Sequence, residues 1–364
     1  MYFEITEDVV TDLVSENLEC LVNLLDTYKQ GNHILAFENR KGINKLINCF
    51  SGSIEEKILY HIYSKHQENK ALKKKINVYV KVMPHSSEMK RSLSPENKTV
   101  FEVPISYFDT QVFATSLVTE DTEDGVFYRG LAERICSEKI FEVPKTILLQ
   151  ATNDSGGGSQ IKTVFMNKAQ IEKRLTFSIC DSDKTSSNSA LGSTARSLKT
   201  ILAKIANENI CDALILNVRE KENLVTPDLY IQHDDYKNKE GLKLLVKLAQ
   251  KESLEELRYL KISGKCEETL NFFKEKQGID IEHTDYSVGK NGLSQIAREF
   301  IYTVDFLKKI RQSCKRNKGE HIHYLSSYDS FFSQLPDELI QEYNRIFVNY
   351  MSWTCAYPKP RFAT

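Results

Sequence analysis

The fold is decided by the stretch Leu117-Val118-Thr119-Glu120-Asp121-Thr122-Glu123-Asp124-Gly125-Val126-Phe127-Tyr128, where an apolar run meets acidic residues and helical spacing begins. Such a junction is typical of a strand that ends and passes into a helix. Regular alternation of strands and helices then predicts a parallel sheet with crossover helices. The predicted strands are 112–119, 145–151, 174–180 and 212–218, and the predicted helices between them are 124–138, 159–172 and 190–207.

Acidic residues follow three of these four strands. Glu120 ends the first, Asp181 and Asp183 follow the third, and Glu222 follows the fourth, while the second runs into the glycine turn 156–158. Ligands of parallel α/β sheets bind at the carboxyl ends of the strands. The carboxylates are therefore expected to share one edge of the sheet, where the glycine turn lets backbone approach closely.

Clustered carboxylates repel one another unless a cation lies among them. Oxygen ligands open to solvent suit Mg²⁺ or Mn²⁺, which can activate a water and neutralise the charge that develops on a phosphodiester. The pattern indicates phosphodiester cleavage or transfer. Lys184, directly after the acidic pair, is placed to stabilise negative charge in the transition state.

Each acid also has a simpler interpretation. Glu120 and Asp124 are of the type favoured at helix starts. Asp181 and Asp183 could belong to an ordinary polar turn, since two aspartates at this spacing arise by chance about once in a chain of this length. Glu222 could be a solvated loop acid. The position of the aspartate pair directly after an apolar run favours the functional interpretation.

Several motifs resemble those of Toprim domains. The segment 120–128 resembles the E-G-x-x-D-x-x-F-Y opening of these domains, and 181–183 resembles their D-x-D. The glycine turn 156–158 and the segment 219–224 look like features of Toprim nucleases of bacterial phage defence. These are the overcoming-lysogenization-defect nucleases and the effector subunit of PARIS-type systems. The similarity covers about one third of the 364 residues.

The resemblance implies a Rossmann-like Toprim core with Glu120 as metal ligand or general base. Asp181 and Asp183 would be metal ligands, joined by Asp124 from the first motif, and Glu222 would be a further acid with a catalytic part. The expected activity is that of a Mg²⁺-dependent endonuclease acting on DNA or RNA, tRNA included. It would be an anti-phage effector controlled by a separate ABC-type ATPase. Whether it forms a homodimer is left open.

One residue departs from the family pattern, because Asp121 stands where the family has glycine. The second hypothesis is a non-catalytic, degenerate Toprim subunit that docks onto an ATPase. A weaker third is a phosphatase or other phosphoryl-transfer enzyme. The chain has no G-x-x-x-x-G-K-[ST] motif, so ATP hydrolysis is assigned to a partner.

The chain outside the predicted core divides into two parts. Residues 1–110 are expected to form an α/β accessory domain, with strands at 33–37 and 76–83 and an exposed loop at 84–98; the core is 111–235. Residues 236–364 are expected to form a helical C-terminal domain. Its predicted helices lie near 240–250, 253–261, 265–277, 291–316 and 336–352.

The charge balance excludes binding of nucleic acid by bulk charge, because 49 basic residues face 50 acidic ones. Two local basic patches are predicted to contact a phosphate backbone. Solvated helix faces would explain either patch equally well. The predicted contacts are Lys73, Lys74 and Lys75 in the first patch and Lys308, Lys309, Arg311, Lys315 and Arg316 in the second.

Composition also indicates the compartment. The eight cysteines form no C-x-x-C pair, which is typical of reduced thiols rather than of a disulfide framework or a structural zinc site. No apolar run approaches the roughly 20 residues that cross a bilayer. The first residues lack the basic and apolar regions of a secretory signal. A cytoplasmic protein without membrane contact is expected.

Overall fold

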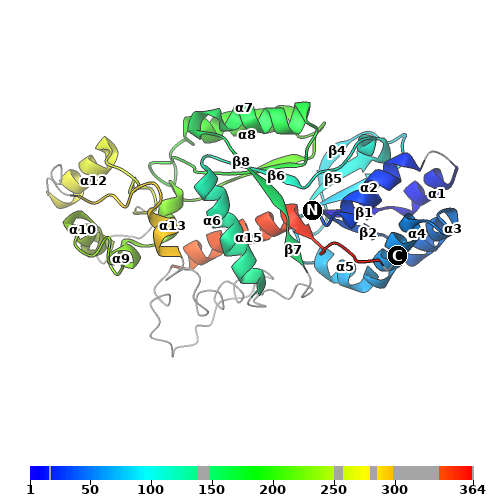
Figure 1. Cartoon of the computed structure of the whole chain (residues 1–364). Coiled ribbons are helices and arrows are strands. Elements are labelled where there is room, and N and C mark those ends of the chain that lie inside the picture. The colour runs from blue at the N-terminus through cyan, green and yellow to red at the C-terminus, as the bar shows by residue number, and fades with distance from the viewer. Residues whose placement is uncertain (16–17, 138–146, 250–256, 279–284, 298–335, 363–364) are drawn as a thin grey trace.

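The computed structural model describes residues 1–15, 18–137, 147–249, 257–278, 285–297 and 336–362. Two larger sheets of five and four strands are arranged along the molecule, with the last long helix between them (Figure 1), and a third sheet consists of two short strands. The fold is mixed α/β with mostly parallel strands, as the sequence predicts. None of the helices in the described part is long and apolar enough to cross a membrane.

The N-terminal sheet has the order β2-β1-β3-β5-β4, and every pair is parallel except β4 with β5. The predicted strands 33–37 and 76–83 are confirmed as β2 and β3. The predicted loop 84–98 is wrong in part, because it contains β4, an edge strand whose polar residues give no apolar alternation. The elements are β1 (Tyr2–Ile5), α1 (Glu7–Ser15), α2 (Glu19–Lys29), β2 (Ile34–Phe37), α3 (Arg40–Cys49), α4 (Ile54–Ser64), α5 (His66–Lys73), β3 (Val78–Met83), β4 (Lys90–Leu93), β5 (Thr99–Pro104) and η1 (Ile105–Phe108).

The second sheet has four parallel strands in the order β10-β9-β6-β8, and we call it the parallel sheet. Its two central strands, β6 and β9, are buried along their whole length, their threonine and serine residues included. Helices occupy the three predicted connections. The elements are β6 (Thr115–Thr119), α6 (Thr122–Ser137), β8 (Ala151–Ser155), η2 (Gly158–Gln160), α7 (Ile161–Met166), η3 (Asn167–Ile171), β9 (Thr176–Cys180), α8 (Ser193–Ile205) and β10 (Cys211–Ile215).

The second predicted strand lies later in the chain than expected. The apolar residues near 148 form only a short strand, β7 (Leu148–Leu149), which pairs antiparallel with β11 (Cys355–Ala356). The sheet strand β8 begins at Ala151 and consists of mostly polar, partly exposed residues. β8 is at the edge of the sheet, where a strand does not need an apolar face. Its sequence therefore has no regular pattern of apolar residues from which the strand could be located.

The C-terminal part is helical where it is described. The predicted helices 240–250, 265–277 and 336–352 are present, and 291–316 is described only as its first turns. Of 253–261, residues 253–256 lie outside the described residues, and 258–261 form no helix. The elements are η4 (Lys221–Leu224), α9 (Pro227–Tyr230), α10 (Glu240–Ala249), α12 (Glu267–Gln277), α13 (Gly292–Ile296) and α15 (Asp337–Thr354).

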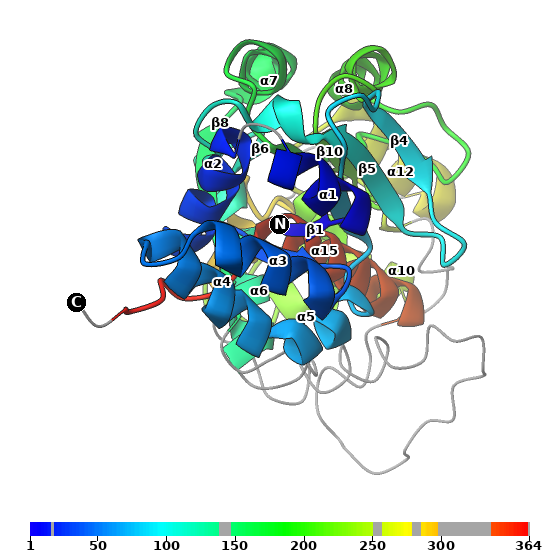
Figure 2. The ribbon, with the colours of Figure 1, turned by 90° about the vertical axis from the view of Figure 1, so that its right-hand side faces the viewer.

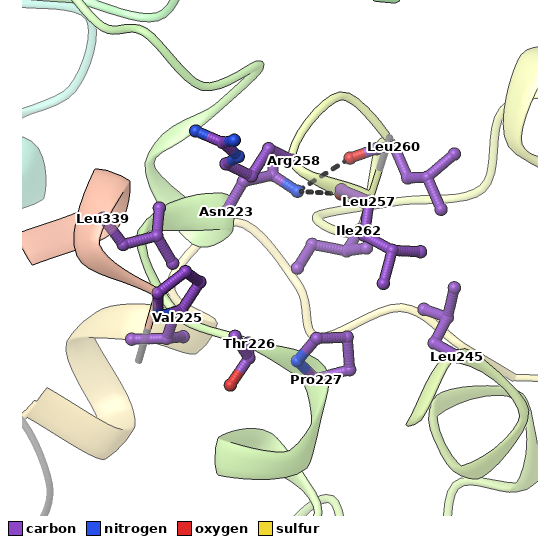
Figure 3. A pocket seen from close by; sticks show the side chains of 11 residues that line it. Asn223, Val225, Thr226, Pro227, Leu245, Leu257, Arg258, Leu260, Ile262 and Leu339 are labelled. Carbon is purple, nitrogen blue, oxygen red and sulfur yellow. Dashed lines mark hydrogen bonds between the residues drawn. The ribbon is translucent and has the colours of Figure 1, made fainter. Parts of the chain in front are cut away.

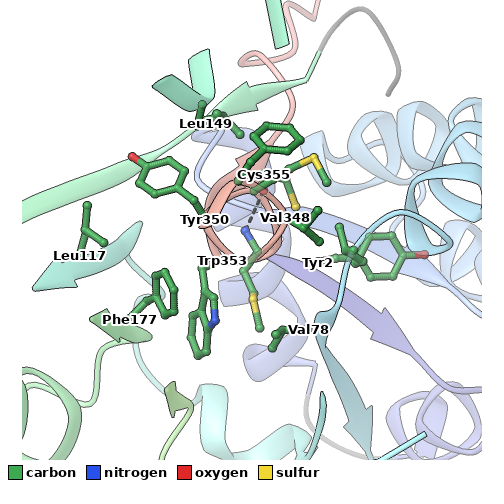
Figure 4. Packing of buried hydrophobic residues seen from close by; sticks show 14 of the residues in the cluster. Tyr2, Val78, Leu117, Leu149, Phe177, Val348, Tyr350, Trp353 and Cys355 are labelled. Atoms are coloured by element: carbon green, nitrogen blue, oxygen red, sulfur yellow. Dashed lines mark hydrogen bonds between the residues drawn. The ribbon is translucent and has the colours of Figure 1, made fainter. Parts of the chain in front are cut away.

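Helix α15 joins the two sheets. Trp353 near its end stacks on Phe177 of β9, with ring centres 5.4 Å apart, and meets Phe101 of β5 edge-on at 5.8 Å (Figure 4). Nearer its start, the Glu342 carboxylate accepts hydrogen bonds from the backbone and side chain of Asn217, each 2.9 Å long, just after β10. The predicted boundaries at 110 and 235 stay predictions, but α15 packs against both α/β parts rather than standing apart.

Candidate functional site

Five predicted acidic side chains gather where the parallel strands end. We call this group the acidic rim; its members are Glu120, Asp124, Asp181, Asp183 and Glu222. Each lies near enough to others of the group for their charges to interact. Glu222 of the rim lies in η4, which packs against α13.

Glu120 follows β6 directly and is held by the glycine turn. The backbone N–H of Gly158 donates to the Glu120 carbonyl at 3.0 Å, so the turn packs against the end of the strand. Burial, together with the negative charges of Asp183 and Asp124, raises the pKa of the Glu120 carboxyl to about 7. Its Oε1 is buried without a hydrogen-bond partner in the described structure. Glu120 therefore has an unused oxygen and a pKa near neutrality.

A tight turn after β9 presents the two aspartates. The buried Ser182 hydroxyl donates to the Val218 carbonyl, which ties this turn to the chain after β10. Asp183 adopts φ of 51°, in the left-handed region that aspartate tolerates better than most residues. A Cβ on Gly192 would lie 2.2 Å from Cβ of Asp183, so only glycine allows α8 to begin this close to the turn.

A buried lysine lies inside the rim. Nζ of Lys221 is 2.6 Å from Oδ1 of Asp124, and its backbone N–H donates to Oδ1 of Asp181 at 3.0 Å. Burial would lower the pKa of this ammonium, but the carboxylates of Asp124 and Glu222 outweigh burial and raise it. Lys221 thus remains charged and offsets part of the negative charge of the rim.

Glu222 is buried, with 3% of its surface exposed, so the interpretation as a solvated loop acid is wrong. Its Oε1 lies 3.9 Å from Nζ of Lys221 and has no hydrogen-bond partner in the described part of the chain. Burial raises the pKa of the Glu222 carboxyl to about 8. Burial, Glu120 and Glu222 likewise raise the pKa of the Asp181 carboxyl well above its ordinary value.

The turn that carries these residues is anchored from behind. The Glu220 carboxylate accepts from the backbone of Ile262 and Ser263, each at 2.6 Å. The Asn223 amide donates to the carbonyls of Leu257 and Leu260 beside a small apolar pocket (Figure 3). That pocket holds about 20 Å³, roughly the space of a single water, so it supports the turn and is too small for a substrate.

The departure at Asp121 is accommodated. Its side chain accepts from the backbone N–H of Glu123 at 3.1 Å, and its own N–H donates to Oδ2 of Asp124 at 3.1 Å. These bonds satisfy amide groups at the start of α6, as acidic residues often do at helix starts. Asp124 therefore has both roles considered for it, a helix-start acid and a member of the rim.

The rim suits a divalent ion that is held by only part of its coordination shell. No three His, Cys, Asp or Glu side chains of the described residues converge closely enough to form a complete metal cage. Mg²⁺ is usually bound by one or two protein carboxylates together with water and substrate phosphate oxygens. Glu120 with its unpartnered oxygen and the exposed Asp183 are the residues that suit such a partial site.

The predicted basic residues that are described form their side-chain contacts outside the acidic rim. Lys184 donates from Nζ to the carbonyl of Ser187 at 2.7 Å, within its own loop. Lys73 is 2.7 Å from both carboxylate oxygens of Glu4, whereas Lys74 is exposed. Helix α5, which ends at Lys73, lies with the helices of the N-terminal sheet, and in the view of Figure 1 α6 and α15 lie between it and α13. The predicted patch 308–316 lies outside the described residues.

Comparison with known proteins gives no assignment: no protein-family model, curated protein or solved structure matches this chain.

Two site residues escaped the sequence analysis. Lys221 lay within a segment quoted for its acids, and nothing in the local pattern distinguishes a buried lysine from an exposed one. Gly192 had no motif around it. The only available signal for Lys221 was its place between two glutamates after a predicted strand.

Proposed function

We propose that this protein is a Mg²⁺-dependent nuclease of the Toprim type that hydrolyses phosphodiester bonds of DNA or RNA. The observation that carries the proposal is the acidic rim, whose residues follow three of the four parallel strands, and where Lys221 offsets only part of the negative charge. Buried carboxylates with raised pKa values are a recognised sign of a functional site. Glu120 and Asp183 would hold the ion, which would polarise a phosphate oxygen and lower the pKa of a bound water.

Three residues at the rim have properties that suit particular roles in this reaction. Without a metal ion the pKa of Glu120 is near 7, which suits either of the two roles that the resemblance implies for it, metal ligand or general base. Glu222, with a pKa of about 8, keeps its proton at neutral pH. Lys221 holds Asp124 and the backbone of the aspartate turn in place, which fixes the rim before substrate arrives.

The proposal is tested by cleavage of labelled DNA and RNA in Mg²⁺ or Mn²⁺. Glu120→Gln and Asp181→Asn are expected to lower the rate at least about 100-fold. Glu133→Gln, a matched change at an exposed position of the same α6, is expected to leave it unchanged. Cleavage that persists undiminished in both rim variants would refute the proposal.

A second candidate function is a non-catalytic subunit that docks onto an ATPase. It is favoured by the position of the Lys221 ammonium, which lies where a cation is needed and is already bonded to Asp124. Calorimetric titration with Mg²⁺ separates the candidates, since the nuclease should bind the ion and lose it in Asp183→Asn. The partner ATPase and the role in phage defence rest on the sequence resemblance alone.

A further inference from the structure

A broad groove of about 750 Å³ runs between α7 and α8 on the outer face of the parallel sheet, where the two helices lie side by side (Figure 2). Each helix contributes a row of residues spaced by four, the spacing that puts side chains on one helix face. The rows are Lys162, Met166 and Gln170 on one side and Arg196, Thr200 and Lys204 on the other.

The groove is basic and carries no acid. Lys162, Arg196 and Lys204 are its charged lining residues, and each is exposed. None of the three forms an ion pair with the described residues. Lys168 of the same helical segment differs, since it is 3.4 Å from Asp154 and pairs with the glutamate four residues on. The three groove cations are therefore available to an external anion.

One end of the groove meets the acidic rim. Helix α7 follows the glycine turn that packs against Glu120, and α8 begins at Ser193, directly after the glycine in contact with Asp183. Arg196 lies in the first turn of α8 and Lys204 in its last, about 12 Å further along the helix axis at 1.5 Å per residue. The cations thus form a track that leads away from the rim.

We propose that this groove binds the phosphate backbone of a nucleic acid and directs it to the acidic rim, an inference that rests on the proposed nuclease function. Each strand of a duplex carries one phosphate per about 3.4 Å of helix axis, so a track of about 12 Å parallel to that axis covers the rise of three or four nucleotides. Among the described residues that line the groove none is aromatic, so they offer no surface on which bases stack. Binding is therefore expected to be independent of sequence.

The groove suits this task better than the patch predicted from the sequence. Lys73 is neutralised by Glu4, and its helix, α5, lies with the N-terminal sheet rather than with the parallel sheet that carries the rim (Figure 1). Lys162 and Arg196, in contrast, lie on the helices whose first turns adjoin the rim. Their short sequence segments contain too few basic residues to be noticed as a patch.

The test compares two triple variants in EDTA, where cleavage is suppressed. Lys162→Gln/Arg196→Gln/Lys204→Gln removes the groove cations. Lys41→Gln/Lys45→Gln/Lys70→Gln removes three exposed lysines of α3 and α5 as a charge-matched control. Binding of a fluorescein-labelled 24-base-pair DNA duplex and of an RNA duplex of equal length is measured by anisotropy over a range of salt concentrations.

The groove variant is expected to bind at least about tenfold more weakly at low salt. Its salt dependence should fall by a slope of about 2.7, since each lost phosphate contact removes about 0.9. The control should bind as the wild type does. Equal weakening in both variants, unchanged binding in the groove variant, or no binding of either duplex by the wild type would overturn the proposal; the last outcome would point to an acidic protein partner.

Binding and cleavage measured together distinguish failure of the groove proposal from failure of the nuclease proposal. If the wild type cleaves nothing in Mg²⁺ but the groove variant loses binding, the groove stands and the nuclease proposal fails. If the wild type cleaves and the groove variant binds and cleaves equally well, only the groove proposal fails.

Discussion

Replacing Lys221 by methionine gives the sharpest test of how the acidic rim is held together. The lysine is 3% exposed, and its ammonium lies 2.6 Å from Asp124, whose side chain is 19% exposed. Methionine keeps most of the side-chain volume and removes the charge, which leaves Asp124 and its acidic neighbours without their protein cation.

The expected loss follows from the burial of the pair. Removing one partner of a buried ion pair lowers the free energy of unfolding by about 3–5 kcal/mol, because the other charge is left uncompensated. Since water reaches part of Asp124, the lower end applies, and we expect about 3 kcal/mol at neutral pH in EDTA. Glu222 adds little to this figure because its pKa of about 8 keeps it largely protonated at that pH.

The chain offers a direct assay. Trp353 is its only tryptophan and is fully buried between the two sheets, so its fluorescence reports unfolding in a urea titration. Lys184→Met is the control, since that lysine contacts only its own loop; we expect a change below about 0.5 kcal/mol. Equal stability of Lys221→Met and the wild type, or an equal loss in the control, would refute this account of the rim.

Mg²⁺ adds a second arm to the same experiment. If a divalent ion binds among these carboxylates, it should stabilise Lys221→Met more than the wild type, because the competing ammonium is gone and the ion binds only the folded state. An equal effect of Mg²⁺ on both proteins would show that the ion and the lysine do not share the rim.

Periodicity predicted the parts of the fold in which burial repeats regularly. The strands β6 and β9 lie within the segments predicted for them and are buried on both faces, and α15 shows helical spacing over its length. Strands β1, β5 and β8 were missed or displaced. β8 is at an edge, where burial makes little demand on the sequence, and the buried strand β1 has only four residues, too few for a periodic pattern. The position of α15 between the sheets depends on contacts such as Trp353 with Phe101, more than 200 residues apart, which no local pattern encodes.

The acids of the site were predictable because strand topology alone brings them together, as for Glu120 and Asp183. Their electrostatic state was not, since it depends on how far the fold excludes water. The same limit applies to Lys221, which the sequence shows only as one cation among 49 basic residues. A formal charge of -1 thus conceals a buried acidic rim and a basic groove beside it.

Three further changes test packing, geometry and titration. Trp353→Ala should lower the free energy of unfolding by about 3–5 kcal/mol, measured by circular dichroism, and a loss below about 1 kcal/mol would contradict its bridging role. Gly192→Ala should displace Asp183 and reduce cleavage, whereas Gly264→Ala, where a Cβ meets nothing within 4 Å, should not; equal activities would contradict the close approach. Glu222 makes the wild type sensitive to pH, because burial raises the pKa of this carboxyl to about 8 from an unfolded value of about 4.3. The folded state binds this proton more tightly, so its stabilising effect is complete below about pH 4.3 and is lost as the pH rises through 8. Glu222→Gln lacks the titrating group, so between pH 5 and 9 it should lose less stability than the wild type, by on the order of 2 kcal/mol; parallel pH profiles would show that the carboxyl is not held protonated.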